Sequence, residues 1–255
     1  MLPGMQPGAL DAAVAALVTA RRSRTRIAAL PPGSNPASLA EAHAAQDATV
    51  AALGDRVAGW KVAITPQHEV MRGVILGSCL FPSPASIPAK DVPLLGIEGE
   101  IGFLFARPLP PRAAEYGPDD VAAASIAVVG IEIVASRFTD YAGTPLLDRT
   151  ADCMSNGAYI LGTRRHDWRG TDLSQLEATL CINGTIVVRK TAGHPTGDPI
   201  IPAVALANAL RNSTGIATGQ LITTGTYTGL NFASPGDRIA ITFTGFGTAE
   251  VTITR

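Results

Sequence analysis

Three glutamates stand on two apolar segments, and their spacing suggests metal chemistry. Glu98 and Glu100 lie two residues apart in the strand-like segment 94–105, and Glu132 lies inside the apolar run 126–134. Side chains two apart on a β-strand leave the same face, so Glu98 and Glu100 point the same way. A carboxylate inside a buried strand is unfavourable unless it is paired or binds a cation. Three oxygen donors on two strands suit a hard divalent cation, Mg2+ or Mn2+.

The residues alone also allow a plainer interpretation of the acidic segment. Ile97 and Ile101 share the face opposite Glu98 and Glu100, which is the pattern of a half-buried strand with a solvated acidic side. Glu132 favours a metal site, but structural ion pairs also hold buried carboxylates, so both interpretations stay open. Several glycines leave room for a ligand or another backbone segment to approach, namely Gly96, Gly99, Gly102 and Gly130.

The composition points to a small-molecule partner. The 255 residues include 20 basic and 21 acidic side chains, so a formal charge of -1 attracts neither nucleic acid nor an anionic membrane. Apolar residues make up 46% and charged residues 16%, which is sparse charge for a monomer, and we expect a homo-oligomer. The three cysteines fit neither a disulfide framework nor a zinc pattern. With no secretory signal or membrane-spanning run, we expect a soluble cytoplasmic protein.

Four arginines follow the first helical pattern and have two interpretations. An organellar presequence or a basic arm would be rich in arginine, as is this stretch with Arg21, Arg22, Arg24 and Arg26. An acidic residue, Asp11, precedes them, and the segment continues a helical pattern. We therefore expect a solvated helix end.

The chain divides into a helical start and a β-rich remainder. Alanine-rich patterns predict helices over 10–18 and from Ser38 to Val50, so residues 1–55 are expected to form a helical cap. Residues 56–255 are expected to form one β-rich domain, interrupted by a helix over 201–212. Its predicted strands lie near 60–64, 97–105, 126–134, 178–189, 220–224 and 238–253. The dipeptide Asn183-Gly184 predicts a tight hairpin turn.

A series of short motifs runs in order along nearly the whole chain. These motifs are Gly-Trp-Lys-Val at 59–62, the Glu98-x-Glu100 strand, Gly-Ile-Glu-Ile-Val-Ala-Ser-Arg at 130–137, Ala-Asp-Cys-Met-Ser-Asn-Gly at 151–157, Asn183-Gly184, Gly-His-Pro at 193–195, Ala-Val-Ala-Leu-Ala-Asn at 203–208, Gly-Thr-Tyr-Thr-Gly at 225–229 and Pro-Gly-Asp-Arg at 235–238. Each is short, but their collinear order is specific. Together they resemble the 2-oxopent-4-enoate hydratase and 4-oxalocrotonate decarboxylase group of the fumarylacetoacetase superfamily.

The resemblance implies a mixed α/β fold, with a fumarylacetoacetase C-terminal-like β-roll or barrel behind an amino-terminal helical cap. It also implies homo-oligomers that bind Mg2+ or Mn2+ through three carboxylates, aligned with Glu98, Glu100 and Glu132. The family's lysine aligns with Lys61. On physical grounds alone, Lys61 is more simply an edge residue whose stem lies along apolar surface.

The activity implied by the resemblance is addition of water to a 2-hydroxy-2,4-dienoate of the 2-oxopent-4-enoate type, in the catabolism of aromatic meta-cleavage products. A 2-oxo or 2-hydroxydienoic acid can chelate a metal through one carboxylate oxygen and the adjacent oxygen. Lys61 would move a proton or hold the substrate's negative charge, with a pKa lowered by burial beside a dication, while Ser155 and Thr226 or Thr228 would bind the substrate carboxylate. Three alternatives stay open: a decarboxylase, a carbon–carbon bond hydrolase of a 2-oxo acid, and a non-catalytic partner subunit.

One segment departs from the family pattern. Typical hydratases carry an acidic residue in a longer segment after the lysine strand, but this chain has no carboxylate between Glu69 and Asp91. His68 and Glu69 fall near the place where the hydrolase branch of the superfamily has a histidine and a glutamate. We take them as candidate catalytic residues, with an exposed loop histidine as the alternative for His68.

Overall fold

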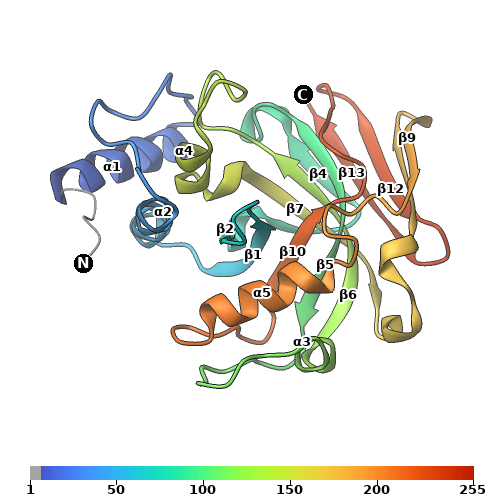
Figure 1. The fold of residues 1–255 in the computed structure, drawn as a ribbon. Helices are drawn as coiled ribbons and strands as arrows, with labels where there is room; N and C mark the ends of the chain where they lie inside the picture. The colour runs from blue at the N-terminus through green and yellow to red at the C-terminus, as the bar shows by residue number, and fades with distance from the viewer. Residues whose placement is uncertain (1–6) are drawn as a thin grey trace.

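Two β-sheets form the centre of the protein, and helices cover one side and one end. The computed structural model describes residues 7–255, and the ribbon is shown in Figure 1. The helices are α1 (Pro7–Ser23), α2 (Leu39–Leu53), α3 (Pro118–Ala124), α4 (Leu146–Ala151) and α5 (Ile200–Leu210). Among the described helices, none is long and apolar enough to cross a membrane.

The first sheet carries the residues of interest. Its strands run in the order β2-β1-β10-β5-β6-β7-β3, with β11 paired to β5. Their bounds are β1 (Val57–Ile64), β2 (Val70–Leu76), β3 (Leu80–Pro82), β5 (Gly96–Phe105), β6 (Ser125–Val134), β7 (Asn156–Arg165), β10 (Leu221–Thr226) and β11 (Asn231–Phe232). The β5–β6 pair is antiparallel over the full length of both strands, which places both at the centre of a rigid surface.

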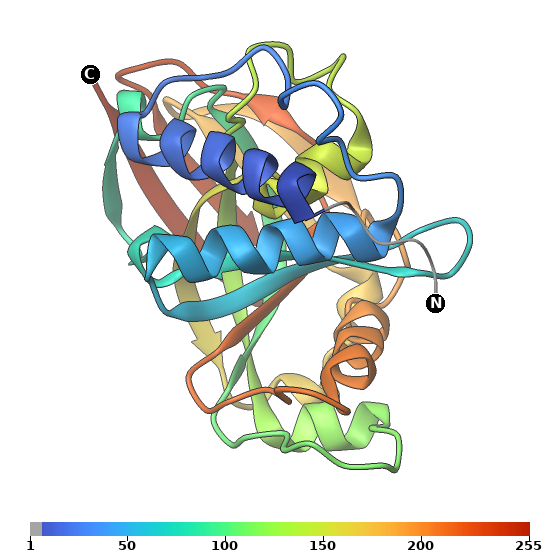
Figure 2. The same ribbon diagram turned by 90° about the vertical axis from the view of Figure 1, so that its left-hand side faces the viewer.

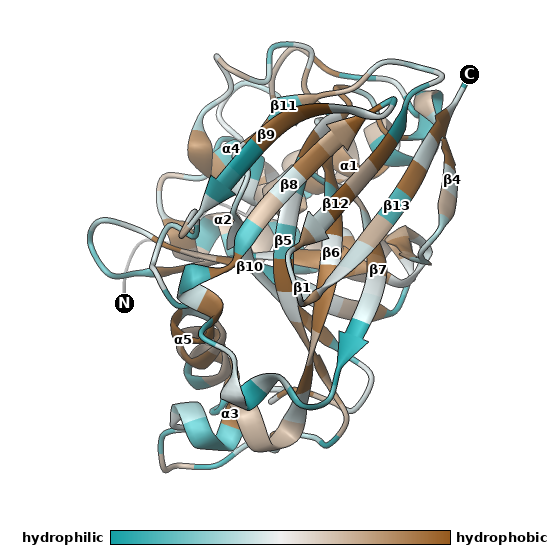
Figure 3. Ribbon diagram, turned by 90° about the vertical axis from the view of Figure 1, so that its right-hand side faces the viewer, coloured by the Kyte–Doolittle hydropathy of each residue, from teal (hydrophilic) through white to brown (hydrophobic). Residues whose placement is uncertain are grey.

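The second sheet packs against β6 and β7 of the first. Its order is β4-β13-β12-β8-β9, with bounds β4 (Ala85–Pro88), β8 (Glu177–Ile182), β9 (Thr185–Thr191), β12 (Arg238–Phe243) and β13 (Gly247–Thr254). Apolar and polar residues alternate along these strands (Figure 3), and the apolar ones join the main core. Asn183 and Gly184 have φ values of 53° and 80°, so the predicted tight hairpin between β8 and β9 is confirmed.

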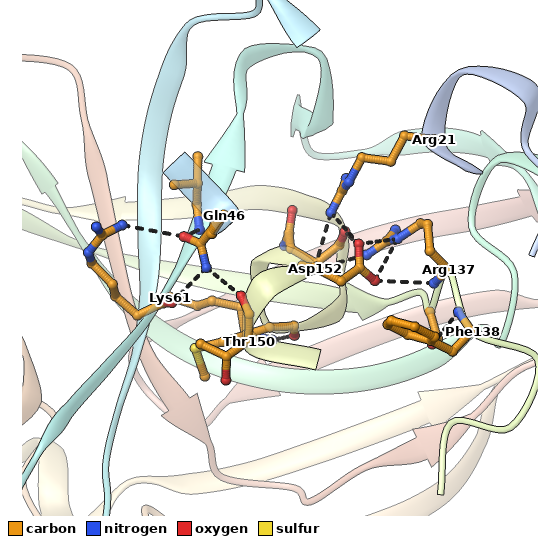
Figure 4. Close-up of polar contacts among 12 residues, drawn as sticks. Arg21, Gln46, Lys61, Arg137, Phe138, Thr150 and Asp152 are labelled. Atoms are coloured by element: carbon orange, nitrogen blue, oxygen red, sulfur yellow. Dashed lines mark hydrogen bonds and ion pairs between the residues drawn. The ribbon is translucent and has the colours of Figure 1, made fainter. Parts of the chain in front are cut away.

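The helices α1 and α2 lie side by side (Figure 2). Ser38 caps α2 by accepting a hydrogen bond from the Glu41 backbone, and Gly54 ends it at a φ of 72°. The buried amide of Gln46 connects α2 to its neighbours (Figure 4). It donates to the carbonyls of Arg72 at 3.0 Å and Thr150 at 2.6 Å. Because its oxygen also accepts from a backbone N–H, this amide is satisfied on both sides.

Most predicted elements are present, and several further elements escaped prediction. Both amino-terminal helices, the predicted strands and the helix near 201–212 are confirmed within a few residues. The strands β2, β3, β4, β7 and β11 and the short helices α3 and α4 were not predicted. Residues 1–6 of the predicted cap lie outside the described residues, and its separation from 56–255 as a domain stays a prediction.

Candidate metal centre

Strand pairing brings the three glutamates together. Glu98 of β5 lies directly opposite Glu132 of β6, and Glu100 follows two residues later on the same face. One carboxylate oxygen from each residue lies within 4.8 Å of the other two. Glu132 is fully buried, Glu100 is buried and Glu98 is half-buried. The pattern seen in the sequence is therefore a single cluster in space and not a solvated acidic face.

The cluster concentrates negative charge where water is scarce. Burial, followed by the charge of Glu132, raises the pKa of Glu98 to about 7, while Lys61 opposes this rise. Burial and the charges of Glu132 and Glu98 raise the pKa of Glu100 well above its ordinary value. A cation bound between the three carboxylates would offset their mutual repulsion and compensate their burial.

Lys61 supplies one positive charge to the cluster. It lies on β1, and its Nζ donates to Glu132 Oε1 at 2.5 Å and to the Met154 carbonyl at 3.0 Å. Burial alone would lower the pKa of Lys61, but the attraction of the glutamates, with Glu132 the strongest, outweighs burial and raises it. From the sequence we expected a lowered pKa for Lys61, because a neighbouring dication was assumed. Without that cation, the carboxylates raise the pKa of Lys61. Lys61 is therefore an ammonium here and not a solvent-facing edge residue.

The two oxygens of Glu132 have different surroundings. Oε1 accepts from Lys61 and also from Asn156 Nδ2 at 3.2 Å. Oε2 is buried, and no described residue donates to it. A buried carboxylate oxygen without a donor is unfavourable unless a further cation or donor faces it. This orphaned oxygen, in a set made only of carboxylates, fits a hard divalent cation such as Mg2+ or Mn2+.

A strained turn carries the backbone contact of Lys61. Three consecutive residues adopt left-handed conformations, with φ of 53° at Cys153, 50° at Met154 and 58° at Ser155. Such conformations persist only where the surroundings enforce them, and they cluster at functional sites. Gly73 of β2 makes room for the turn, because a Cβ there would lie 2.6 Å from the Cys153 carbonyl oxygen.

Tyr159 of β7 was not predicted as part of the site. Its side chain is fully buried and lies across Gly130, where an added Cβ would overlap the ring. The Thr223 hydroxyl donates to Glu100 and lies 3.3 Å from the Tyr159 hydroxyl. Gly130, in the middle of a strand, indicated that another group approaches closely. We expected a ligand or a backbone segment at this position, but the structure places the aromatic ring of Tyr159 there. Asn156 was also missed, although it stands in one of the motifs.

The predicted substrate-binding residues lie on two segments that contact the cluster or Lys61. Ser155 is buried next to Met154, and its hydroxyl contacts no described hydrogen-bond partner. Thr226 lies opposite Glu100 in the β10–β5 pair. The Thr228 hydroxyl accepts from the Gly99 backbone at 2.9 Å, which fixes the turn after β10 against β5.

His68 and Glu69 lie away from these groups. Both are exposed in the turn that joins β1 to β2, and His68 has a φ of 63°. Their backbone N–H groups bond within the turn, to Thr65. Among the described contacts, neither side chain reaches Lys61 or the glutamates. Their catalytic role stays a prediction.

Comparison with known proteins identifies the family. Residues 57–254 match the fumarylacetoacetate (FAA) hydrolase C-terminal family, which covers both sheets and the glutamate cluster. The chain belongs to this family. Its relatives include proteins named 2-keto-4-pentenoate hydratase and 4-oxalocrotonate decarboxylase, the group that the motifs indicated, so the resemblance is confirmed.

The relatives of this chain include proteins named as hydratases and proteins named as decarboxylases. The 2-keto-4-pentenoate hydratase of Paraburkholderia xenovorans (strain LB400) is 27% identical over 258 residues, covering 96% of this chain and 95% of the relative. A 4-oxalocrotonate decarboxylase of Pseudomonas putida is 29% identical over 206 residues, covering 77% of each. The structure of 4-oxalocrotonate decarboxylase from Pseudomonas putida G7, complexed with magnesium and adipate, superposes with a TM-score of 0.81 at 21% identity, covering 96% of this chain and 97% of that one. The predicted fold is thereby confirmed.

Proposed function

We propose that this protein is a metal-dependent hydratase that adds water to a 2-hydroxy-2,4-dienoate of the 2-oxopent-4-enoate type. The observation that carries the proposal is the buried cluster of Glu98, Glu100 and Glu132 with Lys61 bonded to its most buried member. A relative named as a hydratase over nearly the full length supports the reaction class. Such a reaction belongs to the catabolism of aromatic meta-cleavage products.

The three glutamates are the proposed ligands of one Mg2+ or Mn2+. Glu132 presents its free Oε2, while Lys61 and Asn156 hold Oε1 and so fix the direction of the carboxylate. The bound ion would act as a Lewis acid that holds two adjacent oxygens of a 2-oxo or 2-hydroxy acid and stabilises negative charge on them. A solved relative at 21% identity carries magnesium, which agrees with this ion class.

Lys61 is the proposed proton carrier at the substrate. In the cluster without a cation the carboxylates raise the pKa of Lys61, so Nζ starts as a proton donor, and a bound dication would lower that pKa toward the range of a proton carrier. The Met154 carbonyl and Glu132 hold the ammonium in one position. Ser155, Thr226 and Thr228 are the proposed contacts of the substrate carboxylate, since each lies on a segment that contacts β5 or Lys61 and its hydroxyl group can donate to a carboxylate.

His68 and Glu69 are the proposed water-activating pair. Both are exposed in the β1–β2 turn, so their action requires this turn to fold over the glutamates when substrate binds. If they act, His68→Ala lowers the rate of water addition and leaves Mn2+ affinity unchanged. An unchanged rate would remove both residues from the mechanism.

Three alternatives share the same site. Decarboxylation and carbon–carbon cleavage of 2-oxo acids also require negative charge to be stabilised next to a carboxylate, and one relative is named as a decarboxylase. A non-catalytic partner subunit would keep the ligands and lose the acid–base groups, which the missing acidic segment after Lys61 favours. Retention of Lys61 and all three glutamates favours an active enzyme. We further propose a cytoplasmic homo-oligomer that acts on a small organic acid.

The experiment is a turnover panel of 2-oxo and 2-hydroxydienoic acids with added Mg2+ or Mn2+. Formation of one product that has gained a molecule of water indicates hydration, release of carbon dioxide indicates decarboxylation, and formation of two acids indicates carbon–carbon hydrolysis. Glu132→Gln should be inactive, while Glu250→Gln, an exposed glutamate on β13, should behave as the parent. Metal binding without turnover of any compound would favour the non-catalytic subunit.

A further inference from the structure

A pocket away from the glutamate cluster lies between the end of α1 and the ends of strands in the first sheet. Its volume is about 390 Å3, and it lies beside Leu76 of β2, Pro93 before β5 and Gly157 of β7. Neither the three glutamates nor Lys61 line it. Residues 152–156 separate the two places, because Asp152 bonds to arginines of the pocket while Met154 and Asn156 bond to Lys61 and Glu132.

The pocket is strongly basic in a chain that is almost neutral. Two acidic side chains line it, Asp55 and Asp91. Six basic side chains line it, namely Arg21, Arg22, Arg24, Arg26, Lys90 and Arg137. The whole chain carries a formal charge of -1, so this positive surplus is local. A concave site lined by one sign of charge concentrates ions of the opposite sign.

The floor of the pocket holds more positive than negative charge. Arg21 Nη2 and Arg137 Nε both donate to Asp152 Oδ1, at 3.0 Å and 2.7 Å (Figure 4). The Arg21 and Arg137 side chains are 10% and 8% exposed, and Asp152 is fully buried. Two guanidinium groups therefore share one carboxylate, and one buried positive charge has no counter-ion among the described residues. Burial, followed by the charge of Arg21, lowers the pKa of Arg137, whereas for Arg21 burial is outweighed by the attraction of Asp152 and nearby groups, which raises its pKa, so Arg137 is the less compensated of the two.

Further donors are free at the floor and the rim. Arg21 Nε is buried, and no described residue accepts its hydrogen bond. A buried donor without an acceptor is unfavourable, and an anion in the pocket can satisfy it. Arg26 and Lys90 are exposed at the rim and form no ion pair with the described acidic residues, whereas Arg24 pairs with Asp91.

From the sequence we predicted that the four arginines near the end of α1 form a solvated helix end, and this is correct for three of them. Arg22, Arg24 and Arg26 are exposed, but Arg21 is buried against Asp152, more than a hundred residues away. That contact joins the helical start of the chain to the β-rich part. The sequence could not reveal it, because the partner lies on a distant segment.

We propose that this pocket binds a small organic anion with at least two negative charges, through carboxylate or phosphate groups. Planar guanidinium groups recognise both kinds of group by paired hydrogen bonds. The volume suits a small metabolite, and Leu53 and Leu76 offer apolar contact to a short carbon chain.

The test is titration calorimetry of the full chain with inorganic phosphate and with succinate, at constant ionic strength, in metal-free and Mg2+-loaded protein. We expect one site per chain for at least one of the two probes in both states. Preference for phosphate would indicate a phosphorylated ligand, and preference for succinate a dicarboxylate. Neither probe should compete with Mg2+, because the anion site excludes the glutamates.

Variants locate the site. Lys90→Gln and Arg26→Gln should each weaken binding by about two- to fivefold, the scale of one exposed ion pair. Arg21→Met should weaken it by more than about tenfold, and Arg137 can still pair one-to-one with Asp152 in that variant. Arg189→Gln, an exposed arginine on β9, is the matched control and should bind as the parent.

Three results would overturn the proposal. The first is absence of binding by both probes. The second is binding seen only with Mg2+ present, which would assign the anion to the glutamate cluster. The third is equal weakening in Lys90→Gln and Arg189→Gln, which would indicate general surface charge. Because none of these measurements requires turnover, the outcome is independent of the proposed hydratase activity.

Discussion

Replacing Lys61 with Met separates the two tasks proposed for this side chain. Methionine keeps an unbranched stem and removes the ammonium that bonds to Glu132 and to the Met154 carbonyl. The side chains of Lys61 and Glu132 are 12% and 0% exposed, so the ion pair is buried. Removing one partner of a buried pair leaves the other charge without compensation. The metal-free variant should therefore lose about 3–5 kcal/mol of stability.

A divalent cation should reverse much of that loss. The positive charge of Lys61 repels a cation held by Glu98, Glu100 and Glu132, so the variant should bind Mn2+ at least as tightly as the parent. The increase in melting temperature on adding Mn2+ should then be larger for the variant than for the parent. Turnover should nevertheless fall by about a hundredfold or more, the scale of losing a general acid or base.

The assay combines thermal unfolding, Mn2+ titration calorimetry and turnover. Lys190→Met is the matched control, because Lys190 is exposed on β9, an edge strand of the second sheet, and forms no ion pair with the described acidic residues. Parental turnover by Lys61→Met would refute the proton-carrier role and leave it to His68 and Glu69. A loss of Mn2+ affinity beyond about tenfold would show that Lys61 organises the ligands rather than the substrate.

Other outcomes follow from the same contacts. Glu132→Gln should weaken Mn2+ binding by more than about tenfold, and parental affinity by calorimetry would mean that the cation site is misplaced. Asn156→Leu, which frees Glu132 Oε1 to rotate, should weaken Mn2+ binding by about tenfold, and no change would exclude an orienting role. Burial and the charge of Arg72 lower the pKa of His43 to about 4, and its Nε2 accepts the Arg72 backbone N–H. The unfolded state therefore binds more protons between pH 6.5 and 4, so the free energy of unfolding falls as pH drops through that window. In urea titrations, the free energy of unfolding of His43→Gln should fall less over the same window. Light scattering should give an oligomer, since large apolar side chains on α4, β9, α5 and β11 are exposed, and a stable monomer at micromolar concentration would contradict this.

The sequence by itself determined that Glu98 and Glu100 share one face and that Glu132 needs a partner. The two-residue spacing of Glu98 and Glu100 places both on one face of any strand, and a glutamate inside the run 126–134 needs a partner wherever that run is buried. The tight turn at Asn183-Gly184 is equally local, because those residues tolerate positive φ. Such features depend on neighbours in the chain, so they could be predicted.

Only the tertiary structure decided what surrounds those carboxylates. The register that sets Glu98 opposite Glu132, the Asn156 amide on Oε1 and the Tyr159 ring over Gly130 all depend on strand order in the sheet. The ion pair between Arg21 and Asp152 joins residues 131 positions apart, although each alone resembles an ordinary surface charge. Contacts of this kind form because the folded chain buries both partners at one place, and no local spacing or periodicity records that meeting.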